Sequence, residues 1–148
     1  IIHTEGVRPA LRFLSAKDFK GANQEFLSAH EHYRNRRFKE CLNDCLKAFE
    51  STMKSICVKR GWPHQPTDTA KPLLDVIFQH GLIPSFMQSH FTGLRSTLEA
   101  GVPTVRNKLG GHGQGTAQVA LPEYLASYAL HLTATNILLL VQAEKELK

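Results

Sequence analysis

The chain has 148 residues, of which 42% are hydrophobic, and it carries a formal net charge of +5 at neutral pH. This length suits one globular domain with a real core and is too short for two, so we expect a single domain over residues 1–148. The positive charge favours anionic partners in general, but it does not separate nucleic acid from metabolites or from simple solubility.

The start of the chain and its cysteines bear on the compartment. The chain begins with Ile1, and its first residues, IIHTEGV, lack the basic start, apolar core and cleavage site of a signal peptide. Three cysteines are an odd number, which argues against a disulfide framework and favours a reducing cytoplasm. We expect the cytoplasmic C-terminal part of a longer protein.

The first predicted elements form a helical hairpin. Residues 23–33 fit a short helix, and a basic turn over residues 34–39 joins it to a longer one. From Phe38 to a stop near Gly61, apolar residues recur at steps of three and four, which marks one face of a helix. Two adjacent helices with so short a connection predict a hairpin.

Two shorter helices follow a loop over residues 61–69. We expect Asp68 or Thr69 to cap the first of them, which ends at Gly81. Pro84 begins the second, which ends at Gly101. After it, the chain is expected to form one or two further helical turns before a group of glycines ends them.

The last predicted helix begins at Pro122 and is apolar nearly all round its middle. Its most apolar part, residues 129–141, contains polar residues and is shorter than the roughly 20 residues that span a bilayer. It therefore predicts a buried central helix in a soluble protein, with no membrane. Because no window alternates apolar and polar residues, the fold class is all-α, a bundle of about five helices.

The stretch TVRNKLGGHGQG, Thr104 to Gly115, places four glycines around one arginine and one histidine. Five residues separate Arg106 from His112, and two glycines just before His112 disfavour a continuous helix through both. The two side chains could therefore meet at one anion. Arginine offers a planar charged fork for phosphate oxygens, and histidine exchanges protons near neutral pH.

The Arg-Asn pair followed by a short gap and a histidine resembles the R-x(4-6)-H motif of the HEPN superfamily of small α-helical bundles. VRNKLGGHGQG, followed by YALHLTATNILLLV, resembles the abortive-infection C-terminal (Abi-C-like) branch. HYRNRRFKECLNDCLKAFESTMKSICVKRGW resembles the central helix of that branch, and KPLLDVIFQHGLIP resembles the segment after it. The resemblance covers most of the chain.

This resemblance implies an activity and its partners. Many HEPN proteins are endoribonucleases of toxin, antiphage and stress-response systems that need neither metal nor cofactor. They act as homodimers whose two motifs meet in a composite cleft. For this chain the resemblance implies RNA as substrate, a second copy as partner, and restraint by a preceding regulatory domain or an antitoxin-like partner.

The resemblance also implies residue roles. Arg106 would bind the scissile phosphate, His112 would act as general acid or base, and Asn107 would position the motif or the substrate. Other residues of the same loop would contact the substrate: Lys108, Gly110, Gly111, Gly113 and Gln114. RNA supplies its own nucleophile, the 2′-hydroxyl, so cleavage should leave a 2′,3′-cyclic phosphate.

One departure and several alternatives accompany these roles. HEPN toxins silenced by nucleotidylation of a tyrosine continue the motif as H-x-Y, whereas here Gly113 and Gln114 follow His112. That mode of regulation is not expected. The glycines could instead simply end a helix, His112 could cap a helix end, and Arg106 could pair with Glu99. The alternative function is a non-catalytic module that binds a nucleotide or a protein.

Other residues invite sites that we weigh against packing. Cys41 and Cys45, with His30 or His32 nearby, resemble a zinc set. We reject this site because Cys45 and Cys57 fall on the apolar face, where free cysteine packs as a small hydrophobe. We expect no metal.

Three more features have two interpretations each. The basic turn could bind an RNA backbone, but a solvated hairpin tip is favoured. Trp62 could stack on a base, although packing over the end of the bundle is favoured. His131 and Asn136 are expected to be hydrogen-bonded core or dimer-interface residues. The cations of the basic turn are Arg34, Arg36, Arg37 and Lys39.

Overall fold

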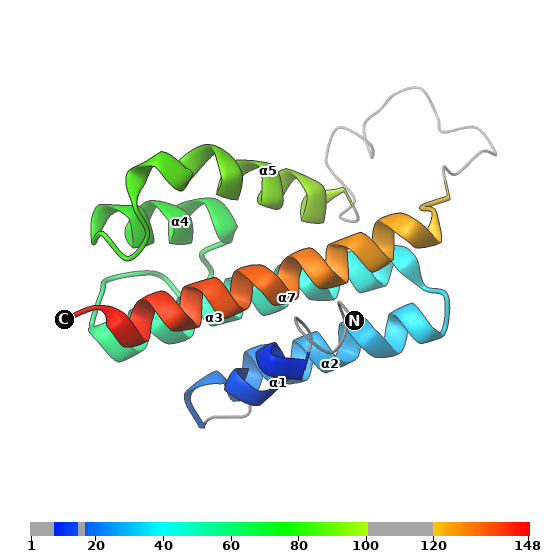
Figure 1. Ribbon diagram of the computed structural model, residues 1–148, viewed down its shortest axis with the longest axis horizontal. Coiled ribbons are helices and arrows are strands. Elements are labelled where there is room, and N and C mark those ends of the chain that lie inside the picture. Colours follow the sequence, from blue (N-terminus) through cyan, green and yellow to red (C-terminus); the bar gives the residue numbers. More distant parts are fainter. Residues whose placement is uncertain (1–7, 15–16, 101–119) are drawn as a thin grey trace.

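The computed structural model describes residues 8–14, 17–100 and 120–148, and these form an all-α bundle, as predicted (Figure 1). The described residues contain no strand. They form six α-helices, where the sequence predicts about five, and the additional one is a short helix that precedes the hairpin. The helices are α1 (Arg8–Leu14), α2 (Lys20–Arg34), α3 (Phe38–Arg60), α4 (Ala70–Gln79), α5 (Gln88–Glu99) and α7 (Glu123–Glu146), with the 3-10 helices η2 (Lys17–Phe19) and η3 (Ser85–Met87).

Helices α3 and α7 lie side by side in the middle of the bundle. In Figure 1, α1 and α2 cover one side of this central pair, and α4 and α5 cover the other. The α2–α3 hairpin that the sequence predicts is confirmed. Ion pairs join residues at the start of α3 to the start of α7, and residues at the end of α3 to the end of α7. The two central helices therefore run parallel.

Three phenylalanine rings fix α4 and α5 against α3. The rings of Phe49 in α3 and Phe91 in α5 are parallel within 4°, with centroids 6.1 Å apart. Phe78 in α4 meets Phe91 at 72°, with centroids 5.9 Å apart. Such aromatic pairs contribute about 0.5–1.5 kcal/mol beyond the area they bury. Phe91 therefore joins three helices.

Helix α7 has the length and composition of a bilayer-spanning helix, but half of its most apolar window is buried within the bundle. Its buried face also holds polar side chains, among them Thr133 and Asn136, which are 0% and 2% exposed. This packing is that of a core helix of the bundle, as the sequence predicts.

Helices α2, α3 and α4 each end on a residue with a left-handed backbone. Gly61 and Gly81 have φ angles of 70° and 71°, and the predicted helix ends at these glycines are confirmed. At the end of α2 the same position is Arg36, with φ 59°. There Arg37 N–H donates to the His32 carbonyl at 2.8 Å, as in a glycine-capped end. The left-handed backbone of a non-glycine residue costs about 1 kcal/mol.

The predicted cap of α4 is wrong. Thr69 makes no capping hydrogen bond, and the Asp68 carboxylate accepts the Gln65 N–H at 2.8 Å instead. The first N–H of α4, from Ala70, donates to a carboxylate oxygen of Glu50 in α3 at 2.9 Å. The sequence rules look for a cap within the segment itself, whereas this helix end is satisfied by a packed neighbour.

A buried carboxylate joins the ends of α3 and α7. Glu144 is 3% exposed and lies 3.2 Å from both Lys59 Nζ and Arg60 Nε. Arg60 also donates to the carbonyl oxygens of Glu144 and Leu147, at 2.6 and 3.0 Å. These carbonyls lie in the last turn of α7, where helix geometry leaves them without partners. Arg60 therefore caps α7 as well as pairing with it.

Glu50 should make stability depend on pH. Burial raises the pKa of this carboxyl above its usual value of 4.5 in the folded chain. The neutral carboxyl therefore stabilises the fold at pH below 4.5, and this contribution is lost as pH rises through the raised folded pKa. Glu50→Gln keeps an acceptor for Ala70 but cannot ionise. Urea unfolding at pH 4 and pH 7 measures the free energy of unfolding of both proteins, and the value of the variant relative to the parent should be higher at pH 7 than at pH 4. A difference that does not change with pH would contradict this.

Removing the buried carboxylate of Glu144 should loosen α7. We expect Glu144→Ala to lower the free energy of unfolding by about 2–3 kcal/mol, because it leaves two cations without their anion at a helix junction. The matched control is Glu146→Ala, which removes an exposed acid two residues away and should change stability by less than about 0.5 kcal/mol. Chemical denaturation of both variants measures the difference, and equal losses would refute a special role for Glu144.

Candidate functional site

The site residues predicted from the sequence lie outside the described residues. They are Arg106, Asn107, Lys108, Gly110, Gly111, His112, Gly113 and Gln114, and the helical turns expected after Pro103 also lie outside. Their roles stay predictions. The structure does place both ends of the segment that carries them. These are Ala100, directly after α5, and Ala120, shortly before α7.

Both ends of this segment lie at one end of the bundle, where Figure 1 also shows the turn between α2 and α3. Helix α5 runs opposite to α7, and His90 Nε2 near its start lies 2.7 Å from Asn136 Oδ1 in the second half of α7. Glu123, the first residue of α7, accepts a hydrogen bond from Tyr33 Oη at 3.2 Å and pairs with Arg36 Nη1 at 3.4 Å. We call this end the motif end of the bundle.

A hollow of about 520 Å³ opens at the motif end, between the α2–α3 turn and the start of α7. We call it the basic hollow. Its Phe38 ring packs against Tyr33, with centroids 5.9 Å apart, and the guanidinium carbon of Arg36 lies 5.2 Å from the centroid of Phe38. It is lined by Arg36, Arg37, Phe38, Lys39, Glu40, Ala120, Leu121, Pro122 and Glu123.

Ion pairs divide the four cations of the basic turn into two kinds. Arg34 pairs with Glu31, and its hydrogen bond lowers the pKa of that carboxyl. Arg36 pairs with Glu123, as described above. Arg37 and Lys39 are exposed, line the hollow, and make no ion pair within the described part of the chain. The exposure of all four cations agrees with the predicted solvated tip, and Arg37 and Lys39 also line a concave surface.

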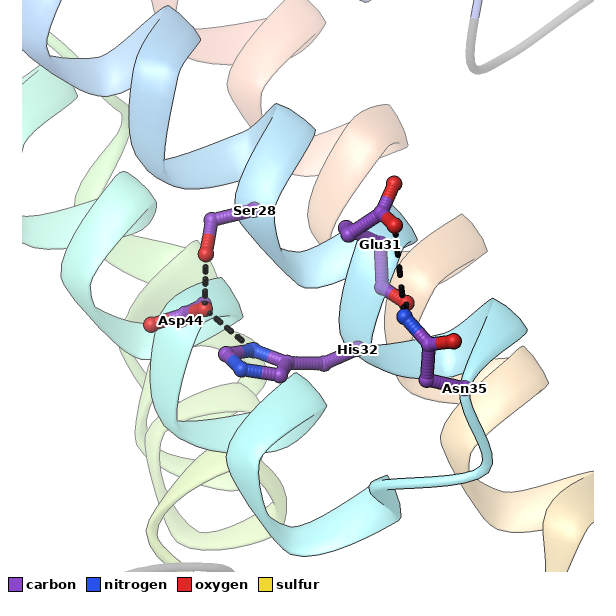
Figure 2. Close-up of polar contacts among 5 residues, drawn as sticks. All are labelled: Ser28, Glu31, His32, Asn35 and Asp44. Carbon is purple, nitrogen blue, oxygen red and sulfur yellow. Dashed lines mark hydrogen bonds and ion pairs between the residues drawn. The ribbon is translucent and has the colours of Figure 1, made fainter.

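A polar cluster lies between α2 and α3, about one helical turn from the basic hollow. Figure 2 shows Ser28 and His32 of α2 both directed at Asp44 of α3. Ser28 Oγ donates to Asp44 Oδ2 at 2.6 Å, and His32 Nδ1 lies 2.8 Å from the same oxygen. Asp44 is 8% exposed. These bonds satisfy a buried carboxylate and hold the hairpin closed.

This arrangement differs from a nucleophilic triad. In a triad the histidine lies between the serine and the carboxylate, so that it can take the hydroxyl proton. Here the Ser28 hydroxyl donates directly to Asp44, and His32 binds the same oxygen from the other side (Figure 2). The cluster is built for hairpin stability. Sequence reasoning missed Asp44, although one acid among the buried positions of an apolar helix face is a signal for a buried partner.

The cysteines pack in the core, as predicted. Cys41, Cys45 and Cys57 are each 0% exposed and free. A hydrogen bond with Cys41 and burial together raise the pKa of Cys45, and burial raises the pKa of Cys57. Thiols with raised pKa are poor nucleophiles and poor metal ligands. Among the described residues, no group of three histidine, cysteine or acidic side chains is placed to hold a metal ion.

The remaining candidates are structural. Trp62 packs against the core and stacks on His80, with centroids 4.6 Å apart and planes 15° apart, so its predicted packing role is confirmed. Asn136 is a hydrogen-bonded core residue, as predicted, and it ties α7 to α5 through His90. Glu99, the alternative partner of Arg106, forms an ion pair with Arg95 at 3.6 Å.

We expect Asp44→Ala to lower the free energy of unfolding by about 1–3 kcal/mol, because the cluster loses its acceptor. His32→Ala should cost less, because Asp44 keeps the Ser28 hydroxyl. The double variant tests the contact directly, since a coupling energy of about 0.5–3 kcal/mol is expected for side chains in one network. Urea denaturation of the four proteins completes the cycle, and strictly additive losses would show that His32 and Asp44 do not stabilise each other.

Comparison with protein families matches residues 20–144 to the Abi-C family, described as a HEPN-like domain. The matched range runs from the start of α2 almost to the end of α7 and includes the Arg106–His112 motif. Comparison with the curated proteins gives no match, and neither does comparison with the solved structures. The family model covers most of the chain and agrees with the all-α bundle. The chain therefore belongs to the HEPN superfamily, in its Abi-C-like branch.

Proposed function

We propose that this chain is a metal-independent endoribonuclease of an abortive-infection or toxin-type defence system, acting in the cytoplasm. The observation that carries the proposal is the Arg106–His112 pair, which falls inside the range matched to the HEPN-like domain. Membership of the family supports an abortive-infection module of the ribonuclease type. The order of the motif, with Asn107 directly after the arginine and four residues between Asn107 and His112, agrees with the R-N-x(3-5)-H form of the superfamily motif.

The proposed chemistry needs only proton transfer and stabilisation of negative charge. Arg106 would hold the scissile phosphate and stabilise the phosphorane. His112 would remove the 2′-hydroxyl proton or protonate the leaving 5′-oxygen, and a second copy would supply the other histidine. General acid–base catalysis of this kind contributes about 10²–10⁴-fold to a rate. The deprotonated 2′-oxygen bonds to phosphorus while the bond from phosphorus to the 5′-oxygen breaks, and that oxygen leaves protonated, so the other product carries a 2′,3′-cyclic phosphate.

A homodimer is part of the proposal, and one face of α7 supports it. Tyr124, Tyr128 and Leu139 are 77%, 53% and 37% exposed. Their spacing, with exposed Thr135 between them, puts them along one side of the helix. Apolar and aromatic side chains gathered on one helix face are typical of protein interfaces. This face begins at the motif end, so pairing by a two-fold axis close to Tyr124 and Tyr128 would bring two motifs together.

The second candidate is a non-catalytic module that binds a nucleotide, or a partner that restrains a larger protein. The basic hollow favours this candidate because, among the described residues, its lining combines cations and apolar side chains but includes no histidine. Such a surface can bind a phosphate without transferring a proton. In that case Arg106 would contribute to binding, and His112 would be dispensable.

Cleavage of a mixed-sequence RNA in the presence of EDTA tests the proposal. The parent should form cyclic-phosphate products, and Arg106→Ala or His112→Ala should each slow cleavage by about 10²–10⁴-fold. His64→Ala and Lys71→Ala are matched controls, since both residues lie away from the motif end and should leave the rate unchanged. Circular dichroism and sedimentation must show all variants folded and in the same oligomeric state.

Two outcomes would contradict the ribonuclease proposal. Undiminished cleavage by His112→Ala would remove the histidine from the mechanism. A parent that binds RNA or a nucleotide but leaves it intact, in any oligomeric state, would favour the binding module.

A further inference from the structure

We infer that the basic hollow is a second RNA contact, a site for the phosphodiester backbone of the bound strand outside the motif loop. The inference deepens the proposed function, since it names how the substrate is held, and it rests on that function only for the identity of the ligand. Its residues all lie in the described part of the chain. They come from the α2–α3 turn and the approach to α7, not from the motif.

Two cations make the hollow suitable for phosphates. Arg37 and Lys39 both line it, both are exposed, and neither is neutralised by an ion pair within the described residues. Arginine binds two phosphate oxygens through its planar fork, and lysine contributes a mobile point charge. Together they can hold consecutive phosphates of one strand.

The start of α3 adds to this field. Its first residue, Phe38, lines the hollow, and no side chain caps the helix there. A 23-residue helix presents its positive dipole end and unpaired N–H groups at this point. The cations of Arg37 and Lys39 therefore act in the same direction as the helix.

The apolar lining favours a nucleic-acid strand over a free anion. Phe38, Leu121 and Pro122 form part of the same surface as the two cations. A strand alternates charged phosphates with the flatter, less polar ribose and base, and the lining offers partners for both. An isolated phosphate would use only the cations.

The acids near the hollow do not cancel its charge. Glu123 is already engaged by the Tyr33 hydroxyl and the Arg36 guanidinium, so its charge is matched. Glu40 also lines the hollow and opposes phosphate binding, while Arg37 and Lys39 outnumber it. Ala120 connects this surface directly to the motif segment in the chain. A strand bound at the hollow would therefore continue toward the residues proposed to cleave it.

The test measures binding separately from cleavage. The probe is a fluorescein-labelled single strand of about 12 nucleotides, a length within the usual range of strand-binding sites, with 2′-O-methyl groups that block cleavage. We compare the full chain with Arg37→Gln/Lys39→Gln. The control is Lys17→Gln/Lys20→Gln, which removes the same charge near the start of α2, at the end of the bundle opposite the basic turn. Anisotropy titrations at several salt concentrations give the affinity and its salt slope.

We expect the hollow variant to bind about tenfold more weakly than the control, with a salt slope smaller by about 1.4, since each lost phosphate contact on a single strand removes about 0.7. On cleavable RNA, its KM should rise while kcat stays within about twofold of the parent. Arg106→Ala should instead lower kcat.

The two proposals can fail separately. If the hollow variant and the control bind the probe alike, the hollow is not an RNA site, even when the parent cleaves RNA. If the parent cleaves no RNA but the hollow variant alone loses affinity, the inference stands and the ribonuclease proposal falls. A loss of kcat equal to that of Arg106→Ala would place the hollow in the chemistry itself and overturn its role as a strand contact.

Discussion

The parallel packing of α3 against α7 is the constraint on which the rest of the fold depends. Each of these helices is tied to the other at both ends, at the start through Arg36 and Glu123 and at the finish through Glu144 with Lys59 and Arg60. The two ties differ in strength. The pair at the start is exposed, so water and salt screen it, whereas Glu144 is almost fully buried and matched by two cations. Helix α7 is thus anchored by a buried carboxylate far from the motif end and by an exposed ion pair at the motif end.

The same packing gathers the features of functional interest at one end. Because α2 runs against α3 and α5 runs against α7, the α2–α3 turn, the end of α5 and the start of α7 meet there. Arg36 lies where these elements meet, and its backbone conformation is unfavourable. It occupies a left-handed position that glycine fills at the ends of α3 and α4. In return its guanidinium reaches both the Phe38 ring and the Glu123 carboxylate. A glycine there would ease the backbone but could make neither contact, and strained residues of this kind gather at functional surfaces.

Much of this architecture follows from local sequence rules, and the exceptions share a physical reason. Helix periods and glycine or proline boundaries predict α3, α4, α5 and α7 well, because each rule concerns neighbours in the chain. The cap of α4 by Glu50 and the burial of Asp44 and Glu144 escape them, since each depends on a helix distant in sequence. Helix α1 was missed because seven residues are too few to show a period. The Arg106–His112 motif could be found from sequence, whereas the basic hollow could not, because it exists only where the α2–α3 turn meets residues 120–123.

The parallel arrangement of α3 and α7 also bears on how the chain folds. Parallel neighbours cannot be joined by a tight turn, so the chain must return along the bundle between them, and α5, which runs opposite to α7, forms part of that return. The α2–α3 hairpin needs only a short loop to close, whereas docking of α7 closes a much longer stretch of chain and carries a larger loop-closure entropy. We expect the hairpin to form early and α7 to dock late. Contacts formed late mainly govern the unfolding rate. The carboxylate of Glu144, which anchors α7, would therefore slow the unfolding of the folded chain.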